Sequence, residues 1–296
     1  MGYSSHAVRT INFYRIVLLL CLAFSGCGKK AQPQPDHPRL TPEVTLQDVT
    51  VHSSALNRDM QYRVILPVGI DKSKKLPVVY LLHGAGGNFR DWSNYSDVAR
   101  FAERGLILVM PEGDESYYMN AATRPKGRYE DYITSDLIRD VESRFPAAND
   151  RSHRAIVGVS MGGFGAITLS LKHPDLFFFA AGISSAIDVP SRPFSWKRIG
   201  QYRGHAAIFG PWDSDNRHNN DPFVLARKVD PSQMPYFYLT CGEQEGLLPS
   251  NRKFAALVAQ RHFRYEFHAG QGGHNWNQWN GILPGVFTSL EKHLNN

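Results

Sequence analysis

Cysteine, long apolar runs and metal-ligand motifs are all scarce in this 296-residue chain. Three cysteines are too few for a disulfide-stapled scaffold, and no apolar run reaches the roughly 20 residues that a membrane-spanning helix needs. There is no H-E-x-x-H segment and no other His, Cys and Asp cluster with ligand spacing. We therefore expect neither a metal nor a cofactor. A hydrophobic content of 42% suffices for a sizeable core.

Concentrated positive charge is also missing, although the net charge is +6. The lysines and arginines are scattered, apart from a short basic run at residues 72–75, and no basic stripe alternates with aromatic residues. Such a distribution is typical of a solvated surface rather than of a nucleic-acid interface. We expect no nucleic-acid partner.

The N-terminus has the pattern of a secretory signal over residues 1–26. Arg9 and Arg15 precede a short apolar stretch, Ile16–Phe24, and small residues lead to Cys27. This segment resembles a bacterial lipobox, in which the cysteine becomes the lipidated first residue of the mature protein. We expect an exported lipoprotein that is held by a lipid at Cys27 and faces the periplasm or the cell exterior. The alternative is ordinary cleavage that leaves Cys27 as a spare thiol.

A proline-rich stretch over residues 27–43 predicts an extended tether, and residues 44–296 then predict one α/β domain. The segments Val44–Val51 and Gln61–Leu66 alternate polar and apolar residues, which predicts an antiparallel hairpin. Short continuous apolar runs follow, separated by helical patterns, and they are typical of strands buried in a parallel sheet. They lie at 76–82, 106–110, 155–159, 176–183 and 236–241, and a last strand is expected at 264–268. Residues 188–235 break this rhythm and predict an insertion over the sheet.

The chemistry is concentrated around Ser160. Gly158–Gly162 reads G-x-S-x-G, directly after one apolar run and at the start of a helical pattern. A strand–turn–helix context of this kind presents a nucleophilic serine on a strained turn, and the glycines make room for it. We therefore predict Ser160 as a nucleophile.

A serine nucleophile needs a base and an acid that orients the base. In α/β-hydrolases these follow in the chain order Ser, acid, His. Glu243 and Glu245 come after a predicted strand, and His274 lies in a glycine-rich loop before the last helix. From this order alone, either glutamate could orient the imidazole of His274.

Two backbone N–H groups are expected to hold the oxyanion of the tetrahedral intermediate. One belongs to Met161, the residue after the nucleophile. The other belongs to Ala85, in the glycine-rich loop LLHGAGGN (81–88) after the predicted strand 76–82.

At this point the sequence resembles the esterase D-like esterase family of α/β-hydrolases. The resemblance runs from about Val44 to Leu294 and rests on VVYLLHGAGGNFRDW, AIVGVSMGGFGAITLSLKHPDLF, YLTCGEQEGLLPSNRKFAALV and GGHNWNQW. That family includes feruloyl and acetyl-xylan esterases, S-formylglutathione hydrolases and the antigen 85 mycolyltransferases. The resemblance implies a mostly parallel sheet with helices on both faces. It also implies Ser160, His274 and Glu245 as a triad, with Glu243 as the alternative acid.

The predicted activity is that of a serine carboxylesterase acting through an acyl-enzyme on a small ester or an acylated carbohydrate. The alternatives are an acyltransferase that uses the same acyl-enzyme, and a non-catalytic lipoprotein that binds carbohydrate or lipid. Tyr118, Asn120 and Trp276 are candidate substrate contacts. Aromatic residues of the insertion are further candidates for lining an acyl or aryl pocket: Phe194, Trp196, Tyr202, Phe209 and Trp212.

Overall fold

The computed structural model describes residues 35–71, 73–193 and 199–294. The chain divides into two units, Met1–Asp36 and His37–Asn296, and the second holds the helices and strands described below. The predicted signal segment and Cys27 lie outside the described residues, as do Phe194, Trp196 and the side chain of Tyr202. None of the helices in the described ranges is both long and apolar enough to cross a bilayer.

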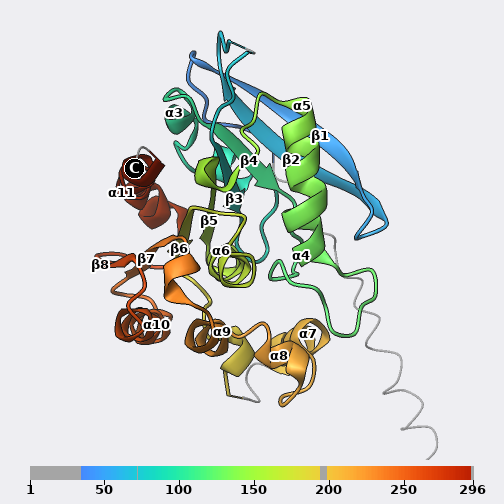
Figure 1. Ribbon diagram of the computed structural model, residues 1–296, viewed down its shortest axis with the longest axis vertical. Helices are drawn as coiled ribbons and strands as arrows, with labels where there is room; N and C mark the ends of the chain where they lie inside the picture. The colour runs from blue at the N-terminus through green and yellow to red at the C-terminus, as the bar shows by residue number, and fades with distance from the viewer. Residues whose placement is uncertain (1–34, 72, 194–198, 295–296) are drawn as a thin grey trace, which may run out of the picture. The chain divides into compact units, whose positions relative to one another are not determined.

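An eight-stranded sheet forms the centre of the second unit (Figure 1). Its spatial order is β1-β2-β4-β3-β5-β6-β7-β8. The strands are β1 (Val44–Ser53), β2 (Arg58–Pro67), β3 (Val78–Leu82), β4 (Ile107–Pro111), β5 (Arg154–Val159), β6 (Phe179–Ile183), β7 (Tyr236–Gly242) and β8 (Tyr265–Gly270). β1 and β2 form the antiparallel hairpin, β2 pairs antiparallel with β4, and all later pairs are parallel. The sheet that the apolar runs predicted is therefore confirmed.

The parallel strands are buried on both faces because alternate side chains enter two separate cores. In β3, Val78, Tyr80 and Leu82 join one core, whereas Val79 and Leu81 join the other. A strand whose two faces are both covered needs an unbroken apolar run, and this is what the sequence supplies.

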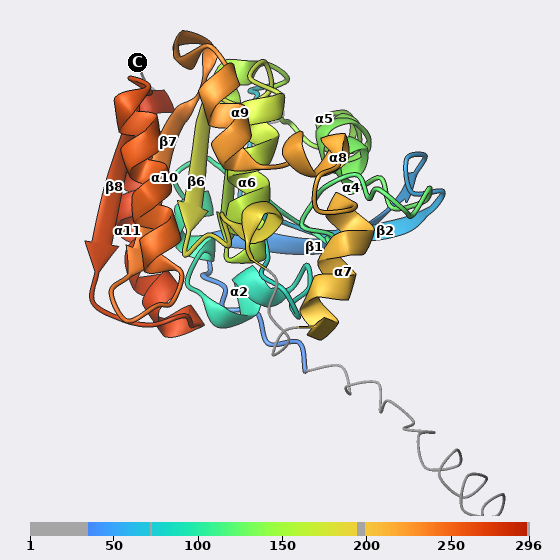
Figure 2. The ribbon, with the colours of Figure 1, turned by 90° about the horizontal axis from the view of Figure 1, so that it is seen from below.

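Helices cover both faces of the sheet (Figure 2). One core takes side chains from α4 (Tyr129–Asp131), a π-helical turn η1 (Tyr132–Leu137), α5 (Ile138–Arg144), α6 (Met161–Lys172) and α10 (Leu248–Gln260). The other core takes side chains from α2 (Asp91–Tyr95), α3 (Ala99–Ala102) and α11 (Trp276–Leu294). Short 3₁₀ turns lie at η2 (Arg151–His153), η3 (Val189–Ser191) and η5 (Pro231–Gln233).

The predicted insertion over residues 188–235 contains three helices in its described part. These are α7 (Ile199–Phe209), α8 (Asp215–His218) and α9 (Pro222–Lys228). Asp221 caps α9 by accepting a hydrogen bond from the N–H of Phe223, and Pro222 stands at the first helical position, where its missing N–H costs nothing. α9 packs against α6, so this segment adjoins the helix that follows Ser160.

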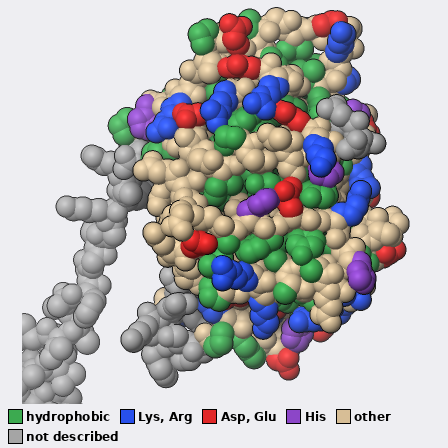
Figure 3. All heavy atoms as spheres, turned by 90° about the vertical axis from the view of Figure 1, so that its left-hand side faces the viewer, with side chains coloured by type: hydrophobic (Ala, Val, Ile, Leu, Met, Phe, Trp, Pro, Cys, Tyr) green, Lys and Arg blue, Asp and Glu red, His purple; other side chains and the backbone are tan. Residues whose placement is uncertain are grey.

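Surface charge is mixed on the face around β8 and α11. Lysine and arginine side chains lie among acidic, histidine and hydrophobic ones there (Figure 3). No single-signed patch of the kind that binds a nucleic-acid backbone is visible on this face.

Candidate active site

Ser160 lies on the turn between β5 and α6 in a strained backbone conformation. Its φ of 56° and ψ of −113° fall in a region that non-glycine residues rarely adopt. Backbone hydrogen bonds hold the turn: the N–H of Ser160 donates to the carbonyl of Ile183 (2.9 Å), and its carbonyl accepts from the N–H of Ala186 (3.0 Å). The side chain is consequently presented at the carboxyl edge of the sheet.

The glycines two residues before and after Ser160 are required because a side chain at either position would clash with the backbone. A Cβ on Gly158 would lie 2.1 Å from the carbonyl oxygen of Gly162, and a Cβ on Gly162 would lie 2.2 Å from that of Leu82. Both neighbours are backbone atoms, which cannot rotate away as a side chain can. The G-x-S-x-G pattern thus follows from the close approach of strand, helix and loop at this turn.

His274 lies between Ser160 and Glu245. Its Nε2 is 2.9 Å from Oγ of Ser160, and its Nδ1 is 2.7 Å from Oε2 of Glu245. The three residues come from the β5–α6 turn, the loop after β7 and the loop after β8. The structure therefore brings together the serine, histidine and glutamate that the sequence predicted in that order. This geometry suits a serine whose proton passes to an imidazole.

The carboxylate of Glu245 is buried, and both of its oxygens take part in hydrogen bonds. Its side chain is 1% exposed, and its Oε1 accepts from Oγ of Ser184 (2.6 Å) and from the N–H of Gly242 (2.9 Å). Burial by itself raises the pKa of a carboxyl group, but the hydrogen bonds from His274, Ser184 and Gly242 outweigh it. The pKa of Glu245 is therefore lowered. An ionised carboxylate at this place orients the imidazole.

Glu243, the alternative acid, lies apart from the imidazole. Its side chain is exposed and accepts a hydrogen bond from Nε2 of Gln271 (2.6 Å). In the structure Glu245 is thus the glutamate that contacts His274.

Two further residues support this arrangement, in roles that the sequence did not predict: Ser184, and Trp279, which the sequence offered only as a candidate for lining a pocket. Ser184, directly after β6, donates to Glu245 and accepts a hydrogen bond from Nε1 of Trp279 (3.0 Å). The ring of Trp279 also meets that of His274 edge-on, with 4.9 Å between centroids. Polar residues directly after the apolar run 176–183 were the available signal for Ser184.

The loop after β3 brings Ala85 to the same place. A Cβ on Gly84 would lie 3.4 Å from Cβ of Ser160, so the loop backbone passes directly beside the serine. In the described part of the chain, no protein group accepts a hydrogen bond from the N–H of Ala85 or of Met161. Both donors are thus available to a bound group.

His83 anchors this loop from inside. Its Nδ1 donates to the carbonyl of Gly84 (2.8 Å), its Nε2 accepts from the N–H of Gly113 (2.9 Å), and Glu112 lies 3.2 Å from that nitrogen. Burial lowers the pKa of His83, but the neighbouring Glu112 outweighs burial and raises it overall.

A cavity of about 410 Å³ opens beside Ser160. Ser160, Ala85, Ala186 and Leu247 lie on its lining, and the remaining lining residues are Glu115, Tyr117, Arg192, Gly204, His205 and Ile208. The last four of these belong to the predicted insertion, so that segment contributes a wall of the cavity. Its lack of periodicity gave no signal for which of its residues would do so.

His205 and Tyr117 form a neutral polar pair in this wall. Oη of Tyr117 and Nε2 of His205 are 3.0 Å apart. Burial, with the charges of Arg192 and Arg217, lowers the pKa of His205 to about 4, and burial raises the pKa of Tyr117 to about 12. Both groups are therefore uncharged near neutral pH and can offer hydrogen bonds to a polar ester.

The three predicted substrate contacts lie elsewhere. Tyr118 is fully buried and donates to the carbonyl of His83 (3.0 Å), so it supports the loop after β3. Both ends of the Asn120 amide are bonded to Asp131. Trp276 packs against Trp92, with 5.3 Å between ring centroids, and does not line the cavity.

Two of the five aromatic residues predicted to line a pocket, Phe209 and Trp212, have described side chains, and neither lines the cavity. Phe209 is fully buried against Phe164, and Trp212 is 47% exposed. Phe194, Trp196 and the side chain of Tyr202 are outside the described residues. Among the residues the structure describes, no three His, Cys, Asp or Glu side chains are grouped so as to hold a metal ion.

Comparison with known proteins shows the family to which the chain belongs. The Esterase family, described as "Putative esterase", matches residues 53–290. An acetyl esterase of Caldicellulosiruptor saccharolyticus is 25% identical over 264 residues, which span 84% of this chain and 99% of the relative. The diacylglycerol acyltransferase/mycolyltransferase Ag85B of Mycobacterium avium is 27% identical over 287 residues, or 86% of this chain and 84% of the relative.

A similar solved structure is FphF, a fluorophosphonate-binding serine hydrolase of Staphylococcus aureus. It superimposes with a TM-score of 0.73 at 25% identity, over 86% of this chain and 99% of that one. The family match and this superposition confirm the predicted fold class and the predicted resemblance.

Proposed function

Because this chain belongs to the Esterase family, we propose that it is an exported serine esterase that acts through an acyl-enzyme on Ser160. The observation that carries the proposal is the position of His274, 2.9 Å from Ser160 and 2.7 Å from the buried Glu245. The proposed substrate is a small ester or an acylated carbohydrate. A cavity of about 410 Å³ beside the serine and the similarity to an acetyl esterase both support a small acyl group.

In the proposed first half-reaction, Oγ of Ser160 attacks the ester carbonyl while Nε2 of His274 takes its proton. The N–H groups of Ala85 and Met161 hold the oxyanion. The carbon–oxygen bond to the alcohol then breaks, and His274 returns the proton to the leaving alkoxide. In the second half, His274 deprotonates a water that attacks the acyl group, and then reprotonates Ser160. Glu245 remains ionised and stabilises the imidazolium in both halves.

The first test is hydrolysis of a p-nitrophenyl ester series, from acetate to decanoate with ferulate added, by the full-length protein and by Ser160→Ala. We expect kcat to fall by about 10⁶-fold in the variant. The matched control is Ser143→Ala, an exposed serine on α5. Lack of hydrolysis of every ester by a folded wild-type protein, or equal rates in Ser160→Ala, would refute the proposal.

An acyltransferase is a second candidate, because the similarity to Ag85B concerns a protein described as an acyltransferase. The acyl-enzyme is the same, and only the second acceptor differs. Product analysis in the presence of added alcohols separates the two activities. A transfer product that exceeds free acid at millimolar acceptor would favour the transferase.

Export and the lipid anchor rest on the N-terminal pattern alone. Metabolic labelling with an alkyne fatty acid in a bacterial host tests both, with Cys27→Ser as the variant and Cys241→Ser as its control. Label on the wild type that is lost only in Cys27→Ser would support the anchor. Unlabelled wild-type protein would contradict the lipid anchor and favour ordinary signal cleavage.

A further inference from the structure

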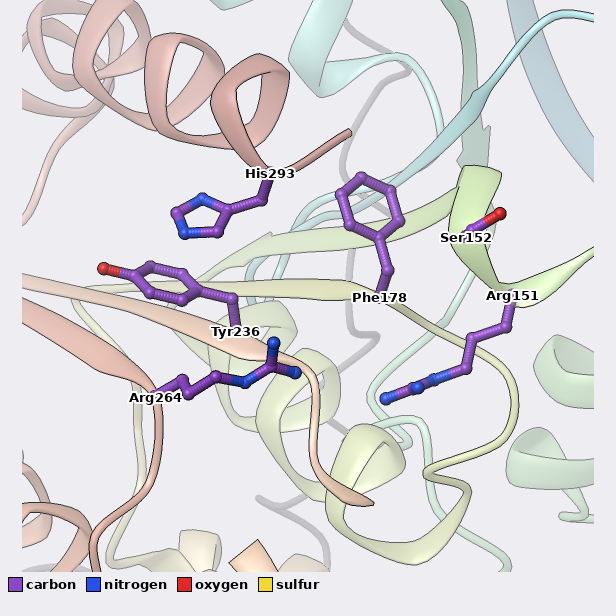
Figure 4. Close-up of a pocket in the computed structure, with 6 residues that line it drawn as sticks. All are labelled: Arg151, Ser152, Phe178, Tyr236, Arg264 and His293. Carbon is purple, nitrogen blue, oxygen red and sulfur yellow. The ribbon is translucent and has the colours of Figure 1, made fainter. Parts of the chain in front are cut away.

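A second cavity lies at the amino ends of the parallel strands, whereas Ser160 lies at their carboxyl ends. It has a volume of about 320 Å³. The residues that line it lie just before or at the start of parallel strands, or near the end of the last helix: Arg151, Ser152, Phe178, Tyr236, Arg264 and His293 (Figure 4). The six residues of β5 separate the two ends by roughly 20 Å. This cavity is therefore distinct from the candidate active site.

Two guanidinium groups lie in this cavity, and both are held by backbone carbonyls. Arg151 donates from Nε to Phe177 (3.1 Å) and from Nη2 to Gln233 (2.9 Å), and Arg264 donates from Nη2 to Met234 (3.0 Å). These bonds hold each guanidinium, and within the described residues no protein group accepts a hydrogen bond from the other N–H groups of the two arginines. Figure 4 shows both side chains extending toward the same space.

Carboxylates do not neutralise this pair. In the described part of the chain, no Asp or Glu oxygen lies within 4 Å of either guanidinium. Asp150 is bonded to His153, Glu266 is bonded to His268, and Asp175 acts on Arg151 only through its charge. Burial, and after it the nearby charge of Arg264, lower the pKa of Arg151 and outweigh the opposite effect of Asp175.

Besides Ser152, the remaining lining residues are aromatic. The ring of His293 stacks on that of Tyr236, with 3.7 Å between centroids and an interplanar angle of 26°. Phe178 lies on another side of the space (Figure 4). Flat, apolar walls of this kind favour a planar ring, whereas a guanidinium fork favours a carboxylate or a phosphate.

We propose that this cavity is a binding site for a small aryl anion, in which a carboxylate or phosphonate bridges Arg151 and Arg264 while the ring lies against Phe178 and the Tyr236–His293 stack. Fixed guanidinium groups lose little side-chain freedom on binding, and an anion relieves their mutual repulsion. The volume is at the lower end of the roughly 300–1,000 Å³ that is typical of small-molecule sites, which fits a single ring.

Calorimetric titration of the full-length protein with phenylphosphonate, benzoate, inorganic phosphate and benzyl alcohol tests the site. We expect the two aryl anions to bind at least about tenfold more tightly than either inorganic phosphate or benzyl alcohol. Equal affinity for inorganic phosphate would overturn the aromatic part of the proposal. Equal affinity for benzyl alcohol, or no binding of the aryl anions, would overturn the site.

Two variants test whether the anion binds in this cavity, and both leave the residues around Ser160 unchanged. Arg264→Gln removes one cation, and its matched control is Arg252→Gln, an exposed arginine on α10. Ser152→Glu adds a negative charge to the lining of the cavity while keeping both arginines, and Ser152→Gln controls for size. We expect the aryl anions to bind at least about tenfold more weakly to Arg264→Gln and to Ser152→Glu than to their controls. Unchanged binding in both variants would contradict the proposal, since an aryl anion in the candidate active site would be insensitive to them.

Discussion

Glu245 Oε2 lies 2.7 Å from Nδ1 of His274, and the carboxylate that makes this contact is almost completely buried. The two residues come from loops that follow neighbouring parallel strands, β7 and β8, so their strand ends already lie side by side. Because Glu245 is held by Ser184 and Gly242 as well, its orientation does not depend on the imidazole. The consequences of this arrangement can be measured.

Glu245→Gln should lower kcat of p-nitrophenyl acetate hydrolysis by about 10⁴-fold, because an amide favours the wrong tautomer of His274 and cannot stabilise the imidazolium. The matched control is Glu243→Gln, whose carboxylate contacts Gln271 instead. We expect the control to keep kcat within about twofold of wild type, as for a surface change. A larger loss in Glu243→Gln than in Glu245→Gln would reverse the assignment of the acid.

Ser184→Ala should reduce the free energy of unfolding by about 1–3 kcal/mol, since it removes one hydrogen bond from the buried Glu245 and leaves the Trp279 indole without its acceptor. It should also lower kcat more than it raises KM, because Ser184 acts on Glu245 and not on the substrate. Ser185→Ala is the control: Oγ of Ser185 is buried with no partner, so its removal should leave stability unchanged or improve it. Denaturant unfolding and steady-state kinetics measure both effects. Equal behaviour of the two variants would argue against a positioning role for Ser184.

Gly162→Ala should destabilise the protein by at least about 2 kcal/mol, because its Cβ would lie 2.2 Å from the carbonyl oxygen of Leu82. The cost is accompanied by lost esterase activity, since the clash displaces the helix start beneath Ser160. Gly246→Ala, where an added Cβ meets nothing within 4 Å, is the control. A thermal unfolding midpoint of Gly162→Ala equal to that of Gly246→Ala would show that the turn can relax.

The stability of the protein should rise with pH between about 4 and 6.5 through His205. The folded protein holds the pKa of His205 at about 4, whereas an unfolded histidine titrates near 6.5, so the unfolded chain binds more protons in that window. His205→Gln keeps a polar group for Tyr117 but removes the titration, and it should flatten this part of the pH–stability curve. The control is His262→Gln, an exposed residue after α10. A curve for His205→Gln that parallels wild type from pH 4 to 6.5 would contradict the assignment.

Several features followed from neighbouring residues alone. The parallel strands were predictable because burial on both faces demands unbroken apolar runs, as in Val78–Leu82. The serine turn was predictable because Gly158 and Gly162 have no space for a side chain. The sequence therefore needs glycine at both positions, and this pattern can be recognised without the structure. Ser160, Glu245 and His274 each follow a strand of the parallel sheet, β5, β7 and β8, which placed them at the same end of the sheet.

Side-chain direction was decided only by the tertiary structure. Glu243 and Glu245 are two residues apart on one loop, yet one is exposed and the other is buried against Ser184. Tyr118 was predicted to face the substrate, but its positive φ and the space left by Gly165 direct it into the core.

The sequence by itself therefore determined which strands form the sheet and which residue stands on its strained turn, because both depend on local pattern and on backbone space. The tertiary structure alone decided which carboxylate meets His274, which residues of the 188–235 segment line the cavity with Ser160, and that Arg151 and Arg264 share a second one. Those outcomes depend on contacts between segments far apart in the chain. No local periodicity encodes the direction in which a loop side chain points.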